Sequence, residues 1–268
     1  MELVEIEKSI IKKYRKEIWS KFIKAVKDFK LINDGDKIAV AISGGKDSLL
    51  LAKLIEELHK HSKVKFDFEC IAMDPGYDRE NRKSLEKNMA YLNIDGKIFD
   101  SDIFKVTEKI SGDYPCYMCA RMRRGFLYAK AKELGCNKVA LGHHMNDVIE
   151  TTLMNVFYAG NFKTMKPKLK AQNFPEMQLL RPMYYIEEKD IIKWRDYIGL
   201  KALDCACKVT KKQESYTRKY IKELIEKISL DIPDLEKSIL KSAENVNCDM
   251  VIAYKMNGKK HSFLEEFE

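Results

Sequence analysis

The 268-residue sequence has no run of about 18 apolar residues, so we expect no membrane-spanning helix. Its start, MELVEIEKSIIKKYRKEIW, mixes charged and apolar side chains and lacks the unbroken apolar core of a secretory signal peptide. We therefore expect a cytoplasmic protein. Internal repeats and low-complexity tracts are also absent from the sequence, which argues against a repeat architecture.

The sequence has seven cysteines, and an odd number in a protein that is not secreted argues against a disulfide framework. Cys70 and Cys136 lie in strand-like surroundings and are predicted to be small core residues. Cys248 has no partner nearby in the sequence and receives no role. The remaining cysteines form two close pairs: Cys116 with Cys119, and Cys205 with Cys207.

The net charge of +8 is consistent with a polyanionic partner, although many enzymes carry such a charge without one. Three basic clusters adjoin or lie between the cysteine pairs: Arg121, Arg123 and Arg124; Lys163, Lys166, Lys168 and Lys170; and Lys208, Lys211, Lys212, Arg218, Lys219 and Lys222. Each is either a surface for a polyanion or an ordinary solvated loop or helix face. If Cys119 opens a helix, Arg121 and Arg124 share one side of it and Arg123 points elsewhere.

Hydrophobic patterning predicts an α/β protein with a parallel sheet. Predicted strands at 36–43, 65–74, 96–100 and 137–144 alternate with predicted helices at 46–61, 79–94, 119–135 and 146–160. Such alternation indicates βαβ units and a Rossmann-like sheet covered on both faces. We expect an N-terminal helical segment (1–32), the α/β domain (33–190) and a helical C-terminal region (191–268).

Sites in parallel sheets lie beyond the carboxyl ends of the strands, which here are followed by SGGKDS, MDPGYD and GHHMND. The first of these, Ser43–Gly44–Gly45–Lys46–Asp47–Ser48, leads straight into a helix. Its glycines let the backbone approach a ligand, and the amides at the helix start suit a phosphate group. Lys46 adds a charge, and Ser43 and Ser48 add hydroxyl donors.

The loop matches neither a Walker A motif nor a Gly-x-Gly-x-x-Gly dinucleotide motif. Together with Ser43–Ser48, the candidate nucleotide-binding positions are Ala41, Met73 and Gly142, at the ends of three predicted strands.

The chemistry of the cysteines alone leaves three readings open. Cys116, Cys119, Cys205 and Cys207 could supply the four ligands of a structural zinc site. Cys116 and Cys119 could be a redox pair, but such a pair usually opens a helix directly after a strand, and here a loop, SGDYP, precedes it. Three of the cysteines could instead hold an iron–sulfur cluster.

The segment AVAISGGKDSLLL resembles the PP-loop of the N-type ATP pyrophosphatases, whose signature is Ser-Gly-Gly-x-Asp-Ser. The segments CYMCARMRRGFLY, GHHMNDVIETTLMNVFYAG, MKPKL and LLRPMYYIEEKDI occur in the same order as in the tRNA 2-thiocytidine synthetases. The resemblance covers roughly residues 10–225. It implies an enzyme that splits ATP between the α and β phosphates and adenylates a substrate oxygen.

The resemblance also implies a [4Fe-4S] cluster held by three cysteines. Carried over, these ligands are Cys116, Cys119 and, counting from EKD, Cys205. The family commonly has Cys-x-x-Cys at the third position, whereas this chain has Cys205–Ala206–Cys207, so Cys207 is the alternative ligand. Three protein ligands would leave one iron open to bind a sulfide.

By this resemblance, the protein is expected to replace the C2 oxygen of an anticodon-loop cytidine in tRNA with sulfur. Lys46, Asp47 and Asp147 are the expected catalytic residues, with Mg²⁺, ATP and the cluster as cofactors. His143 and His144 are assigned to packing or hydrogen bonding near the nucleotide. Related sulfur-transferring enzymes often have an Asp before the residue equivalent to Asp147, where this chain has Asn146.

The expected partners are the anticodon stem–loop, a second copy of the chain, and a sulfur donor such as a cysteine desulfurase or free sulfide. Two alternatives remain open at this point. One is a related thiolase that acts on uridine, and the other is a zinc-stabilised module that binds ATP and RNA without thiolating it.

Overall fold

The computed structural model describes residues 1–110, 115–203 and 214–267 of the chain. Cys205 and Cys207 lie outside these ranges. The strands are β1 (Lys37–Ile42), β2 (Asp67–Asp74), β3 (Gly96–Asp100), β4 (Lys138–Ala140), β5 (Lys168–Ala171), β6 (Phe174–Leu180), β7 (Ala253–Met256) and β8 (Lys259–Ser262).

The N-terminal helical run comprises α1 (Leu3–Lys8), the π-helices η1 (Ser9–Lys13) and η2 (Arg15–Trp19), and α2 (Ser20–Asp28). The further helices are α3 (Lys46–His61), α4 (Arg79–Tyr91), α5 (Ile103–Ile110), α6 (Pro115–Glu133), α7 (Met145–Ala159), α8 (Glu188–Tyr197), α9 (Glu214–Ser229), α10 (Leu235–Ser242) and the 3₁₀ helices η3 (Cys248–Met250) and η4 (Phe263–Glu266).

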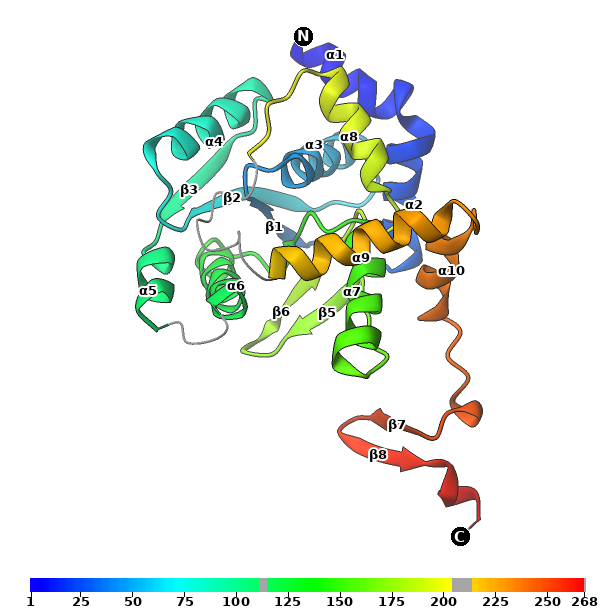
Figure 1. Cartoon of the computed structure of the whole chain (residues 1–268). Helices are drawn as coiled ribbons and strands as arrows, with labels where there is room; N and C mark the ends of the chain where they lie inside the picture. The colour runs from blue at the N-terminus through cyan, green and yellow to red at the C-terminus, as the bar shows by residue number, and fades with distance from the viewer. Residues whose placement is uncertain (111–114, 204–213, 268) are drawn as a thin grey trace.

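Six strands form the central sheet in the order β3-β2-β1-β4-β6-β5, and only β5 runs antiparallel to its neighbour. Figure 1 shows α3, α4, α8 and the N-terminal helices on one face of the sheet, and α5 and α6 on the other. The predicted α/β fold with a Rossmann-like sheet is therefore confirmed.

Both faces of the sheet are buried, as parallel sheets require. Along β1, Ile38 and Val40 pack into the core beneath α3, whereas Ala39 between them packs toward α6. Ile6 and Phe22 of the N-terminal run belong to the same core as α3. The division of the chain at residues 33 and 190 stays a prediction.

The predicted core cysteines are confirmed as buried residues. Cys70 is 3% exposed in β2, and Cys136 is 5% exposed just before β4. Burial raises the pKa of the Cys70 thiol to about 12 and that of Cys136 to about 11. Both thiols therefore stay protonated near neutral pH and are poor metal ligands.

The C-terminal region contains the helices α9 and α10 and, in addition, a hairpin that was not predicted. This β7–β8 hairpin precedes η4 and lies apart from the central sheet (Figure 1). Its turn is Asn257–Gly258, and both residues have positive φ, 52° and 82°. An Asn-Gly turn is the favoured two-residue hairpin connection, so the sequence did carry this signal.

The parallel topology fixes where the site lies. The carboxyl ends of β1 and β4, which pair directly, open at one edge of the sheet, where α3 and α7 begin. Within the described residues, no helix has the length and apolar character that crossing a membrane requires.

Candidate nucleotide and cluster site

The loop between β1 and α3 is a tight turn held by its own side chains. The Ser43 amide donates to Ser48 Oγ over 3.1 Å, and Ser48 Oγ donates to the Gly45 carbonyl over 2.9 Å. Gly44 has φ +83°, and a Cβ there would lie 2.5 Å from Leu203 Cδ1. A side chain at Gly44 would therefore be strained and crowded, which leaves glycine as the residue that fits.

Gly142 brings the end of β4 against the start of α3. A Cβ on Gly142 would lie 3.0 Å from the Asp47 carbonyl carbon and 3.0 Å from the Ser48 nitrogen. This close approach unites two of the predicted nucleotide-binding segments. Ala41 and Met73 are buried in the neighbouring strands β1 and β2, so three of the predicted strand ends line one edge.

Lys46 is held by two carboxylates, one local and one distant in sequence. Its Nζ lies 3.1 Å from Asp47 Oδ1 and 3.0 Å from Glu188 Oε1. Burial opposes the charge on Lys46, but Asp47 and Glu188 outweigh it and raise the pKa of Lys46. The ammonium is therefore charged at physiological pH and is held between Asp47 and Glu188.

Glu188, the first residue of α8, in turn pairs with Lys222 of α9, 2.6 Å from Oε2. Burial of Glu188 opposes its ionisation, yet hydrogen bonds from Lys222 and Lys46 lower its pKa to about 2. A chain of alternating charges thus runs from Asp47 through Lys46 and Glu188 to Lys222.

Asp47 and His144 carry buried polar atoms without hydrogen bonds to described residues. Asp47 Oδ1 accepts no hydrogen bond but lies 3.1 Å from Lys46 Nζ in the ion pair described above and 3.8 Å from His144 Nε2, and His144 Nδ1 makes no hydrogen bond. Burial, the largest influence, raises the pKa of Asp47 against the opposing charges of His144 and Lys46. Unsatisfied buried polar atoms are uncommon in folded proteins and occur at catalytic and binding sites among other places.

Asp147 caps the start of α7. Its Oδ2 accepts a hydrogen bond from the His144 amide over 3.0 Å, and its Oδ1 lies 3.0 Å from Arg218 Nη1 of α9. Burial opposes ionisation of Asp147, but the nearby histidines and Arg218 lower its pKa. The same Arg218 Nη1 lies 3.1 Å from Glu150, whose pKa burial raises to about 7.

His143 is neutral at physiological pH because burial lowers its pKa to about 4. Its Nδ1 accepts a hydrogen bond from Arg181 Nε over 3.3 Å, so the proton of the neutral ring resides on Nε2. Burial lowers the pKa of Arg181 to about 10, and no carboxylate among the described residues pairs with it. His143 thus bonds through its ring and His144 through its backbone amide, and their role near the nucleotide stays a prediction.

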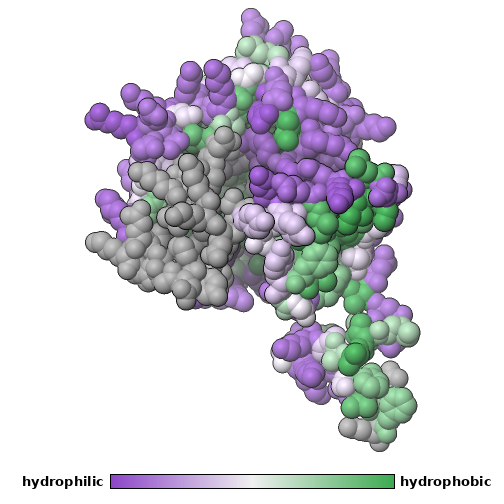
Figure 2. Space-filling model, in the orientation of Figure 1, coloured by the Kyte–Doolittle hydropathy of each residue, from purple (hydrophilic) through white to green (hydrophobic). Residues whose placement is uncertain are grey.

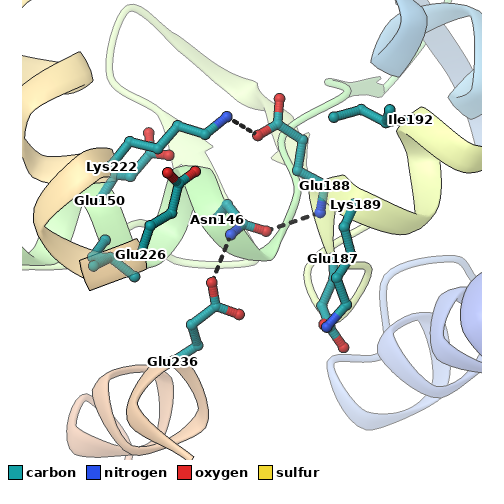
Figure 3. Close-up of a pocket in the computed structure, with 10 residues that line it drawn as sticks. Asn146, Glu150, Glu187, Glu188, Lys189, Ile192, Lys222, Glu226 and Glu236 are labelled. Atoms are coloured by element: carbon teal, nitrogen blue, oxygen red, sulfur yellow. Dashed lines mark hydrogen bonds and ion pairs between the residues drawn. The ribbon is translucent and has the colours of Figure 1, made fainter. Parts of the chain in front are cut away.

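Asn146 joins three helices at the side of the site. Its Oδ1 accepts the Glu188 amide over 2.9 Å, and its Nδ2 donates to Glu236 Oε1 of α10 over 3.1 Å. Figure 3 shows both bonds at a pocket of about 220 Å³ enclosed by α7, α8, α9 and α10. The amide therefore has a structural purpose that a carboxylate could not serve, because it would repel Glu236.

Of the predicted cluster cysteines, Cys119 is half-buried in the first turns of α6, and Cys116 lies three residues earlier on the same helix. Cys205 and Cys207 lie outside the described residues, so the choice between them stays a prediction. Arg121 and Arg124 are exposed and Arg123 is half-buried, consistent with the predicted division of these arginines between helix faces.

The basic clusters differ in whether their side chains are paired or exposed. In the third cluster, Arg218 and Lys222 are engaged by the buried carboxylates described above, and Lys208, Lys211 and Lys212 lie outside the described residues. In the second, Lys163, Lys166 and Lys170 are exposed, and Lys168 donates to the Lys30 carbonyl over 2.8 Å. The exposed lysines could therefore pair with the negative charges of a polyanion.

Glu188, Glu150, Arg181 and Arg218 are site residues that the sequence analysis did not assign to the nucleotide region. Glu188 and Arg181 both lie in LLRPMYYIEEKDI, one of the segments that carry the family resemblance. The contact from Glu188 to Lys46 spans 142 residues, so no local spacing could have indicated it.

The fold and the loop together define a PP-loop protein. Residues 14–228 match the family described as PP-loop domain, and the chain belongs to this family. Its relatives include the tRNA-cytidine(32) 2-sulfurtransferase of Syntrophotalea carbinolica, 38% identical over 225 residues, covering 83% of this chain and 86% of the relative. The protein of the same name from Geobacter metallireducens is 37% identical over 238 residues, covering 88% and 91%. The resemblance to this group of PP-loop enzymes is thereby confirmed.

A solved structure with the same fold is the U34-tRNA thiolase NcsA from Methanococcus maripaludis with its [4Fe-4S] cluster. It is 23% identical, with a TM-score of 0.68, over 84% of this chain and 76% of that chain. The names of the relatives favour the cytidine thiolase over both alternatives, the uridine enzyme and the zinc-stabilised module.

Proposed function

We propose that the protein is an ATP-dependent tRNA thiolase that converts cytidine 32 of tRNA to 2-thiocytidine in the cytoplasm. The observation that carries this proposal is the junction of the Ser43–Ser48 loop with the start of α7, in a chain whose relatives bear the name of that activity. In this proposal the C2 oxygen of cytidine attacks the α-phosphate of ATP and pyrophosphate leaves. Sulfur then replaces the adenylated oxygen, and AMP leaves.

The loop supplies the phosphate site. The amides at the start of α3 and the helix dipole stabilise negative charge. Ser48 Oγ is already committed to the turn, so its role is to hold the loop in shape. Lys46 is charged and would offset the charge that develops as pyrophosphate leaves, once it turns from its carboxylate partners toward the phosphates.

Mg²⁺ fits the carboxylates at this edge. Magnesium prefers oxygen ligands and often binds through one or two carboxylates plus substrate phosphates. Asp47 Oδ1 is buried and pairs with Lys46 Nζ 3.1 Å away, and the neighbours of Asp147 lower its pKa. We assign these two carboxylates to the metal, with Lys46 turning toward phosphate when nucleotide is present.

The [4Fe-4S] cluster fits the cysteines that can be placed. Cys116 and Cys119 are three positions apart on α6, a spacing at which helix positions share a face, and Cys119 is neither fully buried nor fully exposed. We assign Cys116, Cys119 and Cys205 as ligands, with Cys207 as the alternative. Three protein ligands would leave one iron of the cluster without a cysteine, and that iron could carry a sulfide.

The sulfur donor and the second copy of the chain are further parts of the proposal. A cysteine desulfurase or free sulfide would supply sulfur, and two chains would form a homodimer.

Mass spectrometry of tRNA nucleosides tests the proposal. A strain that lacks the gene should lose 2-thiocytidine, wild-type protein should restore it, and Lys46→Ala should not. Undiminished 2-thiocytidine in the deletion strain would refute the proposal, and loss of a 2-thiouridine instead would show that the base is wrong. Iron and zinc content of anaerobically purified protein checks the metal, with several irons per chain and no zinc expected.

A further inference from the structure

The end of α7 protrudes from the body of the protein with large apolar side chains exposed. Val156 is 40% exposed, Phe157 56%, Tyr158 58% and, just beyond the helix, Phe162 51%. Because successive helix residues point about 100° apart, four consecutive exposed residues from Val156 to Ala159 leave every side of the last turn open. Figure 2 shows apolar side chains gathered over the region where Figure 1 draws α7 beside α10.

This segment, Val156–Lys163, which we call the α7 tip, is held in one conformation. Gly160 ends the helix in the left-handed region at φ 58°, and the Asn161 amide donates to the Asn155 carbonyl over 3.1 Å. Asn155 Nδ2 donates to the Lys163 carbonyl over 2.8 Å. Aromatic side chains on a braced turn lose little freedom when they stack on a ligand.

The charge around the α7 tip indicates what that ligand is. Residues 151–175 contain four lysines and neither aspartate nor glutamate, and Lys163 and Lys166 are exposed beside the aromatic residues. A two-fold contact with a second copy would bring these lysines toward each other, because both copies use the same patch. Exposed aromatic rings beside lysines suit a single-stranded nucleic acid, whose bases stack while its phosphates pair with the lysines.

The position of the tip fits a substrate bound at the site. Helix α7 begins beside Asp147 and has 15 residues, so its end lies about 22 Å from its start at about 1.5 Å per residue. That is about six nucleotide steps at about 3.4 Å each. An RNA whose reacting base is at the start of α7 can therefore reach the tip.

Resting on the proposed function, we propose that the α7 tip is a stacking platform for unpaired nucleotides of the tRNA, some distance from the reacting cytidine. The test uses the variant Phe157→Ala, Tyr158→Ala, Phe162→Ala with two probes: an anticodon stem–loop and a duplex of the same stem without unpaired nucleotides. The control, Phe263→Ala with Phe267→Ala, removes aromatic rings that are 45% and 79% exposed near the C-terminus.

The triple variant should bind the stem–loop about tenfold or more weakly, since loss of one stacked base already costs about that much. It should bind the duplex as wild type does, and its salt dependence should not change. The variant Lys163→Ala with Lys166→Ala should instead make the slope of log affinity against log salt shallower by about 0.7 per lost phosphate contact. The control variant should match wild type in both assays.

Unchanged stem–loop affinity in the triple variant would overturn the platform. If the triple variant instead loses a dimer seen by light scattering, or loses binding to anionic lipid vesicles, while RNA affinity stays the same, the tip is a contact for a second copy or for a membrane. Wild-type protein that binds the stem–loop but makes no 2-thiocytidine would refute the proposed function and leave the platform standing.

Discussion

The charge chain Asp47–Lys46–Glu188–Lys222 makes a specific prediction about Glu188. Replacing it by Gln keeps the size of the side chain but removes the negative charge 3.0 Å from Lys46 Nζ. Lys46 would then keep Asp47 as its carboxylate partner among the described residues and would lose one of the two contacts that hold it beside the phosphate loop. We expect Glu188→Gln to raise the KM for ATP with a smaller change in kcat.

The size of the change in KM can be estimated from the ion pair between Lys46 and Glu188. Two unit charges 3.0 Å apart interact by about 5.5 kcal/mol at an effective dielectric constant of about 20. Desolvation and the solvent that still reaches the pair offset most of this, which leaves a net effect of about 1–2 kcal/mol. At about 1.4 kcal/mol per tenfold, the KM for ATP should rise about five- to thirtyfold.

The lowered pKa of Glu188 also predicts how its contribution to the stability of the protein depends on pH. The folded state lowers the pKa of Glu188 from 4.5 to about 2. The stability that Glu188 contributes is therefore fully present above about pH 5 and is lost as the pH falls from the unfolded pKa toward 2. The difference in unfolding free energy between wild type and Glu188→Gln should thus be constant from pH 6 to 8 and shrink below pH 4.

Steady-state kinetics with ATP as the varied substrate provides the assay, and Glu187→Gln provides the control. Glu187 is the neighbouring residue, has the same 18% side-chain exposure, and pairs with Lys21 over 2.6 Å instead of with Lys46. An equal rise in KM in both variants would show a general effect on α8. An unchanged KM in Glu188→Gln would refute the positioning role.

Three further results are expected. Gly142→Ala should abolish detectable ATP binding by calorimetry, because its Cβ would meet the loop backbone at 3.0 Å, whereas Gly125→Ala, where a Cβ meets open space, should bind normally. Cys205→Ser should lose most cluster iron and Cys207→Ser should keep most of it, and a reversed pattern would show that the ligand is Cys207. The pKa of Glu150 is raised to about 7, so the stability of the wild type should fall as the pH rises from 4.5 to 7. In denaturant titrations, Glu150→Gln should therefore be more stable than wild type by about 3 kcal/mol at pH 8 and by less than about 1 kcal/mol at pH 5.

Much of the architecture could be predicted because its signals are local. The helix at 46–61 and the strand at 96–100 have the bounds that hydrophobic patterning indicates. The β5–β6 hairpin was not predicted, because Lys168 and Lys170 made its first strand resemble a basic loop. Those lysines suit an exposed edge strand, where charge discourages pairing with other chains.

Part of the candidate site could likewise be predicted from the sequence, and part could not. The phosphate loop and its glycines could be found from sequence because the turn is built from adjacent residues. The partners that set its electrostatics come from α8 and α9, and the first of them, Glu188, lies 142 residues beyond Lys46. Only the tertiary fold brings Glu188 to Lys46. Local sequence patterns carry no information about contacts between residues so far apart in the chain.

The hydrogen bond between Asn146 and Glu236 restricts which substitutions this chain can accept. The amide at position 146 donates to the carboxylate at 236, and residue 236 lies beyond the 14–228 segment that the family shares. Substituting Asn146 by Asp would place two carboxylates face to face, so the reversion should be tolerated only together with a change such as Glu236→Gln. The two positions are therefore an epistatic pair: among related chains, an aspartate at the first should be accompanied by the loss of the acid at the second.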